Sequence, residues 1–167
     1  MPVVEFKPMA SLTFKLRTVA FLLLLSPPIH GQSGKRFVLL PESETSAISH
    51  LCSRNGPKVG GSWQPTEGDV ELLESHLSRI SKLKSEDGLV GIHISKPSRY
   101  YRQYVGIVIG GRKLIYLNAF STFDEKPPAD WRERLVVGIC DGGPSAWGVL
   151  YDPETKEFSQ LSTNEIA

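Results

Sequence analysis

The chain has 167 residues, of which 40% are apolar and 22% are charged, and its formal net charge is +1. A chain of this length forms about one domain with one core. The balanced charge produces no long-range attraction toward polyanions, so we expect neither nucleic acid nor an anionic membrane surface as a partner.

The first 31 residues have the layout of a secretory signal. Basic residues precede the apolar run TVAFLLLL, and prolines and small residues follow it. The run is far shorter than the roughly 20 apolar residues that a membrane-spanning helix needs. We therefore predict an exported protein, periplasmic or extracellular, whose mature part is a single domain over residues 32–167 without a transmembrane span. The true start, Met1 or Met9, stays open, and a buried N-terminal helix that ends at Pro27 is the alternative interpretation.

The two cysteines, Cys52 and Cys140, both lie in the predicted mature part. Two cysteines in an exported chain most simply form one disulfide, because the compartment is oxidising. The alternative is a pair of buried thiols that pack as small apolar residues. We predict the disulfide.

Residues 32–62 are expected to contain one short strand and an otherwise irregular segment. The strand is predicted over residues 36–40 and is ended by Pro41. Residues 42–62 are rich in serine, glycine and polar side chains, which favours loop structure with a helical turn near residues 47–51.

A helix is the clearest element of residues 63–167. Thr66 is its predicted N-cap and Asp69 completes a capping box, in which each side chain accepts a main-chain N–H of the other residue. Gly88 is a natural terminator beyond its end. Trp63 is expected to pack back onto the helix. One apolar stripe at helical spacing is formed by Val70, Leu73, Leu77 and Ile80.

Beyond the helix the pattern predicts strands joined mainly by tight turns. Gly110-Gly111 is a two-residue hairpin signal, and Asp152 begins a second tight turn. The expected strands span residues 103–109, 112–118, 134–140, 146–152 and 157–162. The predicted fold class is α+β, with one amphipathic helix on an antiparallel sheet of four to five strands, a cystatin-like roll by analogy.

The Gly110-Gly111 turn fixes which residues of the hairpin lie opposite each other. Gln103 then faces Asn118, and this pair is expected to share a hydrogen bond within an otherwise apolar row. We assign that row, which includes Val105 and Ile107, to the face that the helix covers.

The opposite face of the hairpin carries Tyr100, Arg102 and Tyr104. Aromatic side chains beside an arginine are enriched in binding hot spots. We interpret this face as a candidate binding surface. The alternative is a covered face, packed under the N-terminal strand and the Cys52 loop, on which Arg102 pairs with an acidic side chain.

A second candidate binding element is the stretch CDGGPSAWG, residues 140–148. A flexible acidic loop with Asp141 and Trp147 could close over a sugar or a peptide. The alternative is ordinary turn chemistry, because Asp-Gly-Gly is a common turn sequence.

No motif of the sequence indicates catalysis or a metal centre. His50, His76 and His93 lack the spacing of a zinc pair, and no nucleophile elbow or phosphate-binding loop occurs. We therefore expect no catalytic residue, no metal and no cofactor. The predicted function is an exported, non-enzymatic binding module for a protein or cell-envelope component, for which an inhibitor or immunity role fits. The alternative is a small extracytoplasmic hydrolase of an envelope polymer, using Asp141 with Arg102 or a histidine.

Overall fold

The computed structural model describes residues 34–122 and 126–166, together with Met1 and Val3. The description below concerns the unit Gln32–Ala167. The predicted secretory signal lies outside the described residues apart from those two positions, so it stays a prediction.

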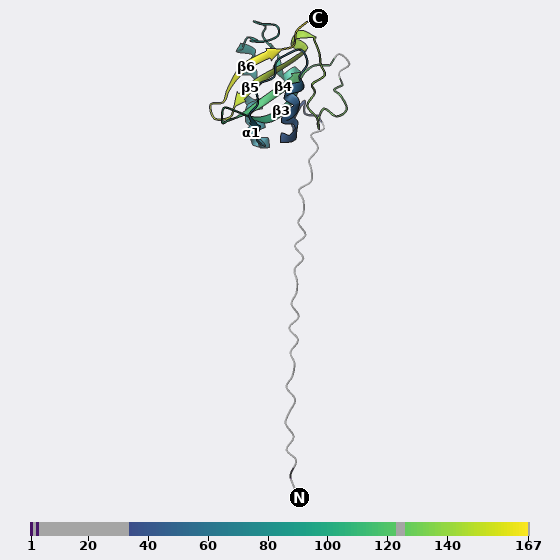
Figure 1. The fold of residues 1–167 in the computed structure, drawn as a ribbon, viewed down its shortest axis with the longest axis vertical. Helices are drawn as coiled ribbons and strands as arrows, with labels where there is room; N and C mark the ends of the chain where they lie inside the picture. Colours follow the sequence, from purple (N-terminus) through teal and green to yellow (C-terminus); the bar gives the residue numbers. More distant parts are fainter. Residues whose placement is uncertain (2, 4–33, 123–125, 167) are drawn as a thin grey trace. The chain divides into compact units, whose positions relative to one another are not determined.

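A mixed β-sheet forms the centre of this unit, and strands β3 to β6 lie side by side in Figure 1. The main path of the sheet is β1–β3–β4–β5–β6, and the short strand β2 pairs with β3 off this path. Neighbours from β3 to β6 are antiparallel, whereas β1 runs parallel to β3. The strands are β1 (Phe37–Leu39), β2 (Gly61–Ser62), β3 (Tyr101–Ile109), β4 (Arg112–Phe120), β5 (Ala146–Asp152) and β6 (Glu157–Thr163).

The α+β class is therefore confirmed, but the expectation of a wholly antiparallel sheet is wrong. Strand β1 is separated from β3 in sequence by helices and by β2. A connection of this length lets a strand return in either direction, whereas a tight turn permits only antiparallel pairing. The short apolar pattern of β1 carries no information about its direction.

The hairpin β3–β4 has the predicted register. Gln103 lies opposite Asn118, and the Asn118 Nδ2 group donates to Gln103 Oε1 at 3.0 Å. Gly110 and Gly111 have φ values of +56° and +81°, the left-handed conformation that a type I′ hairpin turn requires at both positions. The turn chemistry thus sets the register of the two longest strands.

The predicted helix is present as α1 (Glu67–His76), which continues as the 3-10 helix η2 (Leu77–Lys82). The capping box is confirmed: Thr66 Oγ1 accepts the Asp69 main-chain N–H at 3.2 Å, and Asp69 Oδ2 accepts that of Thr66 at 2.8 Å. Trp63 packs against the same core as the helix. The four residues of the predicted stripe are all buried.

No described helix combines the length and the apolarity that crossing a bilayer requires.

Helix α1 covers the sheet face that carries Tyr104, which is the face opposite to the predicted one. Val70 and Leu73 of the helix form one core with Tyr104, Ile115 and other residues of this face. The prediction that the Tyr104 face points outward is therefore wrong. The register was correct, but the central residues of both faces are apolar, so alternation alone could not identify the face that receives the helix.

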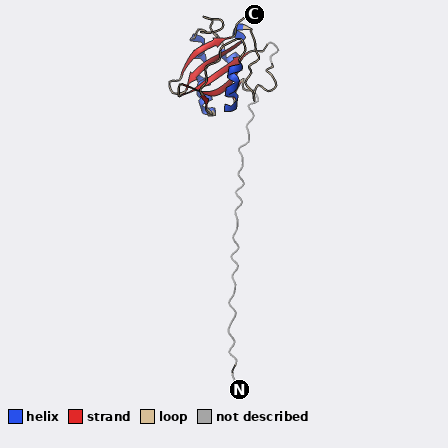
Figure 2. Cartoon of the chain, in the orientation of Figure 1, coloured by secondary structure: helices blue, strands red, loops and turns tan. Residues whose placement is uncertain are grey.

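The other sheet face is also buried, under irregular segments and one 3-10 helix (Figure 2). Val105 and Ile107 pack here in a second core with Ile48 of the 3-10 helix η1 (Glu42–His50). Helix η1 is longer than the single turn that the sequence predicted. Two further 3-10 turns, η3 (Pro97–Arg99) and η4 (Gly143–Ser145), precede β3 and β5.

The predicted strand over residues 134–140 is absent, because this segment bonds to side chains rather than to a neighbouring strand. The main-chain N–H of Val136 donates to Gln103 Oε1 at 2.9 Å, and its carbonyl accepts from Asn118 Nδ2 at 2.9 Å. The N–H of Leu135 donates to Glu44 Oε2 at 2.9 Å. Polar side chains therefore replace a strand ladder, which an apolar sequence run cannot reveal.

Candidate functional site

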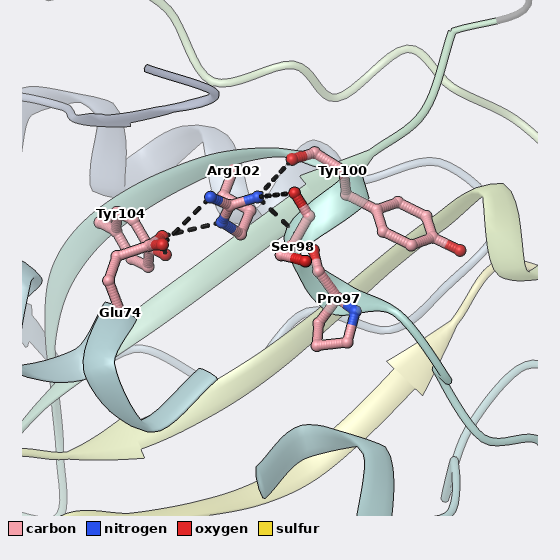
Figure 3. A network of polar contacts seen from close by, with 6 residues as sticks. All are labelled: Glu74, Pro97, Ser98, Tyr100, Arg102 and Tyr104. Carbon is pink, nitrogen blue, oxygen red and sulfur yellow. Dashed lines mark hydrogen bonds and ion pairs between the residues drawn. The ribbon is translucent and has the colours of Figure 1, made fainter. Parts of the chain in front are cut away.

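Arg102, the central residue of the first candidate surface, is an internal structural residue. The residue is 4% exposed, and its guanidinium makes a bidentate ion pair with Glu74 of α1, with contacts of 2.8 and 3.1 Å (Figure 3). The Nη1 group donates to the carbonyls of Ser98 and Tyr100 at 3.0 and 2.5 Å. The hydroxyl of Tyr104 also donates to Glu74. These contacts confirm the alternative expectation that Arg102 pairs with an acid.

The electrostatics of this cluster follow from its burial. Burial, followed by the negative charge of Glu74, raises the pKa of Tyr104 well above its ordinary value. Burial alone would lower the pKa of Arg102, but the hydrogen bond to Glu74 and the electrostatic effects of Tyr104 and Glu74 together outweigh burial and raise the pKa. Arg102 and Tyr104 therefore keep their protons and serve to fix α1 to β3.

Of the remaining predicted site residues, Tyr100 and Trp147 contact each other in the core that contains Tyr104, whereas Asp141 lies elsewhere. Tyr100 is half-buried, and its ring meets the ring of Trp147 edge-on at 5.4 Å. Trp147 is fully buried within β5, so it cannot move as part of a loop. Asp141 lies instead beside Ser53, whose hydroxyl donates to Asp141 Oδ1 at 3.2 Å.

The histidines form no catalytic or metal-binding group within the described part of the chain. The described residues contain no cluster of three histidine, cysteine or acidic side chains placed to hold a metal ion. His76 Nδ1 lies 3.3 Å from the Tyr151 hydroxyl, and partial desolvation, with Arg79 and Lys156 nearby, lowers the pKa of His76. His50 and His93 are exposed.

A groove of about 740 Å³ lies between helix η1 and the segment of residues 54–62. We call it the η1 groove. It lies on the side of the molecule opposite α1, because η1 packs on the second sheet face. Its lining is Glu42, Ser43, Thr45, Ser46, Ile48, Ser49, Leu51, Arg54, Asn55, Gly56, Pro57, Lys58, Val59, Gly61 and Ser62.

Three serines of η1 give one wall of the groove a row of hydroxyls. Ser43, Ser46 and Ser49 are spaced by three, and a 3-10 helix has three residues per turn, so they lie along one edge of it. The Ser46 and Ser49 hydroxyls donate to the carbonyls three residues earlier, at 3.4 and 2.8 Å. All three serines are exposed, and the lone pairs of the hydroxyl oxygens are available to a donor from a ligand.

Arg54 is the buried cation of the groove. It is only 9% exposed, and its guanidinium donates to the side-chain oxygens of Asn118 and Asn164. Its Nε group lies 3.4 Å from the Tyr116 hydroxyl. In the described part of the chain, no carboxylate lies within ion-pair distance of Arg54. Its side-chain partners are therefore neutral.

Hydrogen bonds fix the amide orientation of both asparagines. Asn118 Nδ2 donates to Gln103 and to a carbonyl of the segment after residue 130, and Asn164 Nδ2 donates to the carbonyls of Ile139 and Asp141. Their oxygens are thereby turned toward Arg54. The sequence pattern predicted a hydrogen bond for Asn118 but did not single out Arg54, because an arginine in a polar loop is usually solvated.

The disulfide Cys52–Cys140 is present and holds the ends of this region together. It joins the segment that carries Arg54 to the segment that binds the two asparagines. The arrangement supplies one buried cation, a hydroxyl wall and neutral amides, which can bind and orient a polar ligand. Comparison with protein-family models, with curated proteins and with solved structures gives no match to this chain.

Proposed function

We propose that this chain is an exported, non-enzymatic binding module that holds part of a protein or cell-envelope partner in the η1 groove. The observation that carries the proposal is the groove of about 740 Å³, whose size falls within the range of ligand sites in proteins. Its lining residues combine hydroxyls, apolar side chains, two cations and one carboxylate, and such a mixture can bind and orient a polar ligand.

The disulfide supports the export part of the proposal. Structural disulfides persist in oxidising compartments and are rare in the cytoplasm. The Cys52–Cys140 bond and the absence of a membrane-crossing helix among the described residues agree with an exported protein. An inhibitor or immunity role, and the cystatin analogy from which it came, stay predictions.

The contacts of Asp141 do not favour the hydrolase alternative. That alternative required Asp141 to meet Arg102 or a histidine. The described hydrogen bonds of Asp141 involve Ser53 and Asn164. Arg102 is saturated by Glu74 and by main-chain carbonyls.

The proposal is tested by filling the groove. Ser46→Trp places an indole on the exposed wall of η1, and Ser78→Trp places one on the exposed side of η2, away from the groove. Both changes are at exposed positions of 3-10 helices, so we expect both variants to fold. Each protein is immobilised and exposed to the extracytoplasmic fraction of its own source.

A partner that is retained by the unmodified protein and by Ser78→Trp, but lost from Ser46→Trp, supports the proposal. Equal retention by all three proteins shows that the partner binds elsewhere. Retention of nothing by the unmodified protein contradicts the proposed function.

A further inference from the structure

The charge of Arg54 has no anionic partner among the described residues, although the residue is almost fully buried. Its three hydrogen bonds reach two amide oxygens and one phenol. Removing a charged group from water is costly unless the charge is paired. By contrast, the other buried arginine, Arg102, has a bidentate carboxylate.

Two acidic residues, Asp87 and Asp141, bind the residues next to Arg54 in sequence. Asp87 accepts the main-chain N–H of Asn55 at 2.8 Å and its side-chain amide at 3.2 Å. Asp141 accepts the hydroxyl of Ser53 at 3.2 Å. The residues before and after Arg54 thus each bind a carboxylate. The described hydrogen bonds of these two carboxylates are made with neutral residues.

The guanidinium also has unused donors. An arginine carries five N–H groups, and the described contacts of Arg54 give one acceptor to each of its three nitrogens. The two remaining N–H groups are carried by Nη1 and Nη2, and guanidinium N–H groups form strong, charge-assisted hydrogen bonds with carboxylate and phosphate oxygens. Arg54 lies in the lining of the η1 groove, and exposed Lys58 adds a second cation to the same lining, in which Glu42 is the one acidic residue.

We infer that the η1 groove binds an anionic, hydroxyl-rich ligand with the chemistry of an acidic saccharide. Arg54 binds the anionic oxygens, Lys58 adds charge at the surface, and the hydroxyl oxygens of Ser43, Ser46 and Ser49 accept hydrogen bonds from the ligand hydroxyls. A peptide would present side chains that need separate pockets, whereas this wall is a row of small hydroxyls. The inference rests on the proposed function, because it assigns a ligand class to the same groove.

The test is titration of the purified, oxidised protein by calorimetry at neutral pH and constant ionic strength. The probes are glucuronate, glucose as its uncharged counterpart, inorganic phosphate, and a short peptide with a free terminal carboxylate. We expect glucuronate to bind at least about tenfold more tightly than glucose, a ratio expected for one charge-assisted contact. Binding of phosphate alone would indicate an adventitious anion site and would overturn the saccharide class, as would tighter binding of the peptide.

Variants of the two cations identify the anchor. Arg54→Gln keeps a hydrogen-bond donor toward the asparagines and removes the charge, and we expect the affinity for glucuronate to fall about tenfold, to the level of glucose. Lys58→Ala should weaken binding about twofold, as expected for an exposed charge. Lys84→Ala, at an exposed lysine outside the groove, should change nothing. A folded Arg54→Gln variant that keeps its full affinity overturns the inference.

Ser46→Trp keeps the inference testable if Arg54→Gln does not fold. We expect Ser46→Trp to abolish glucuronate binding and Ser78→Trp to preserve it. If a partner depends on Ser46 but glucuronate neither binds nor competes with it, the ligand class is wrong and the proposed function stands. If glucuronate binding survives in Ser46→Trp, the assignment of the ligand to this groove is wrong.

Discussion

The two buried arginines, Arg102 and Arg54, bind partners of different charge. Arg102 is paired with Glu74, whereas Arg54 is surrounded by neutral oxygens in the described region. Arg102 follows tyrosines within a strand pattern, so the sequence marked it as unusual. Arg54 lies in a polar loop, and nothing in its local sequence shows that a disulfide and two distant asparagines bury it.

Removal of the Glu74 charge should destabilise the protein strongly. In Glu74→Gln, Arg102 stays buried without a counter-charge, and breaking a buried pair in this way costs about 3–5 kcal/mol. We expect a loss of this size in the free energy of unfolding, measured by urea denaturation at pH 7. Glu71→Gln, at an exposed position of the same helix, is the control and should change stability by less than about 0.5 kcal/mol. An equal effect of the two substitutions would contradict the structural role of the ion pair.

At the scale of elements, side-chain contacts decide where tight turns and irregular segments occur. The turn between β5 and β6 is organised by Asp152, whose Oδ1 accepts the N–H groups of Glu154 and Thr155 at 2.9 and 3.3 Å. Its other oxygen accepts from Arg112, whose side chain is 66% exposed. The turn was predictable because aspartate before proline in a tight turn is a local signal. The segment after residue 130 was not predictable, because its partners Gln103 and Asn118 are distant in sequence.

The Asp152 turn predicts a pH-dependent contribution to stability. Burial alone would raise the pKa of Asp152, but the hydrogen bonds from the turn amides and from Arg112 outweigh it and lower the pKa. A carboxyl group whose pKa is lowered in the folded state stabilises the protein at pH values above the ordinary carboxyl pKa of about 3.9. This stabilisation is lost as the pH falls through the folded-state pKa. Asp152→Asn keeps an acceptor for the turn amides but cannot titrate.

We therefore expect Asp152→Asn to flatten the decline of the unfolding free energy below about pH 4, measured by urea denaturation at several pH values. Glu154→Gln is the matched control, since Glu154 is exposed in the same turn. If the unfolding free energy of Asp152→Asn depends on pH in the same way as that of the unmodified protein, the titration of Asp152 does not contribute to stability.

At the scale of the whole molecule, the two faces of one sheet are covered by different kinds of structure. A capped, amphipathic helix covers one face, and the 3-10 helix η1 with irregular segments covers the other. The disulfide and hydrogen bonds from Gln103, Asn118 and Asn164 hold this second cover in place. The η1 groove lies in this second cover, between η1 and the segment of residues 54–62.

The disulfide should therefore contribute much of the stability. It closes a separation of 88 residues, for which the chain-entropy relation gives about 4–5 kcal/mol. We expect the Cys52→Ala/Cys140→Ala variant to lose an amount of this order in the free energy of unfolding, measured in denaturant against the oxidised protein. Reductant should reproduce the loss in the unmodified protein and have no effect on the variant. A reduced protein as stable as the oxidised one would contradict this role.

The sequence by itself determined the features that depend on neighbours along the chain. The capping box of α1, its buried stripe, the register of β3–β4 and the turn at Asp152 all follow from residues a few positions apart. Contacts between distant residues required the tertiary structure: the parallel direction of β1, the face that receives α1, and the burial of Arg54. The physical reason is that local hydrogen bonding and periodicity specify an element, whereas its partner is chosen by packing and charge compensation across the whole fold.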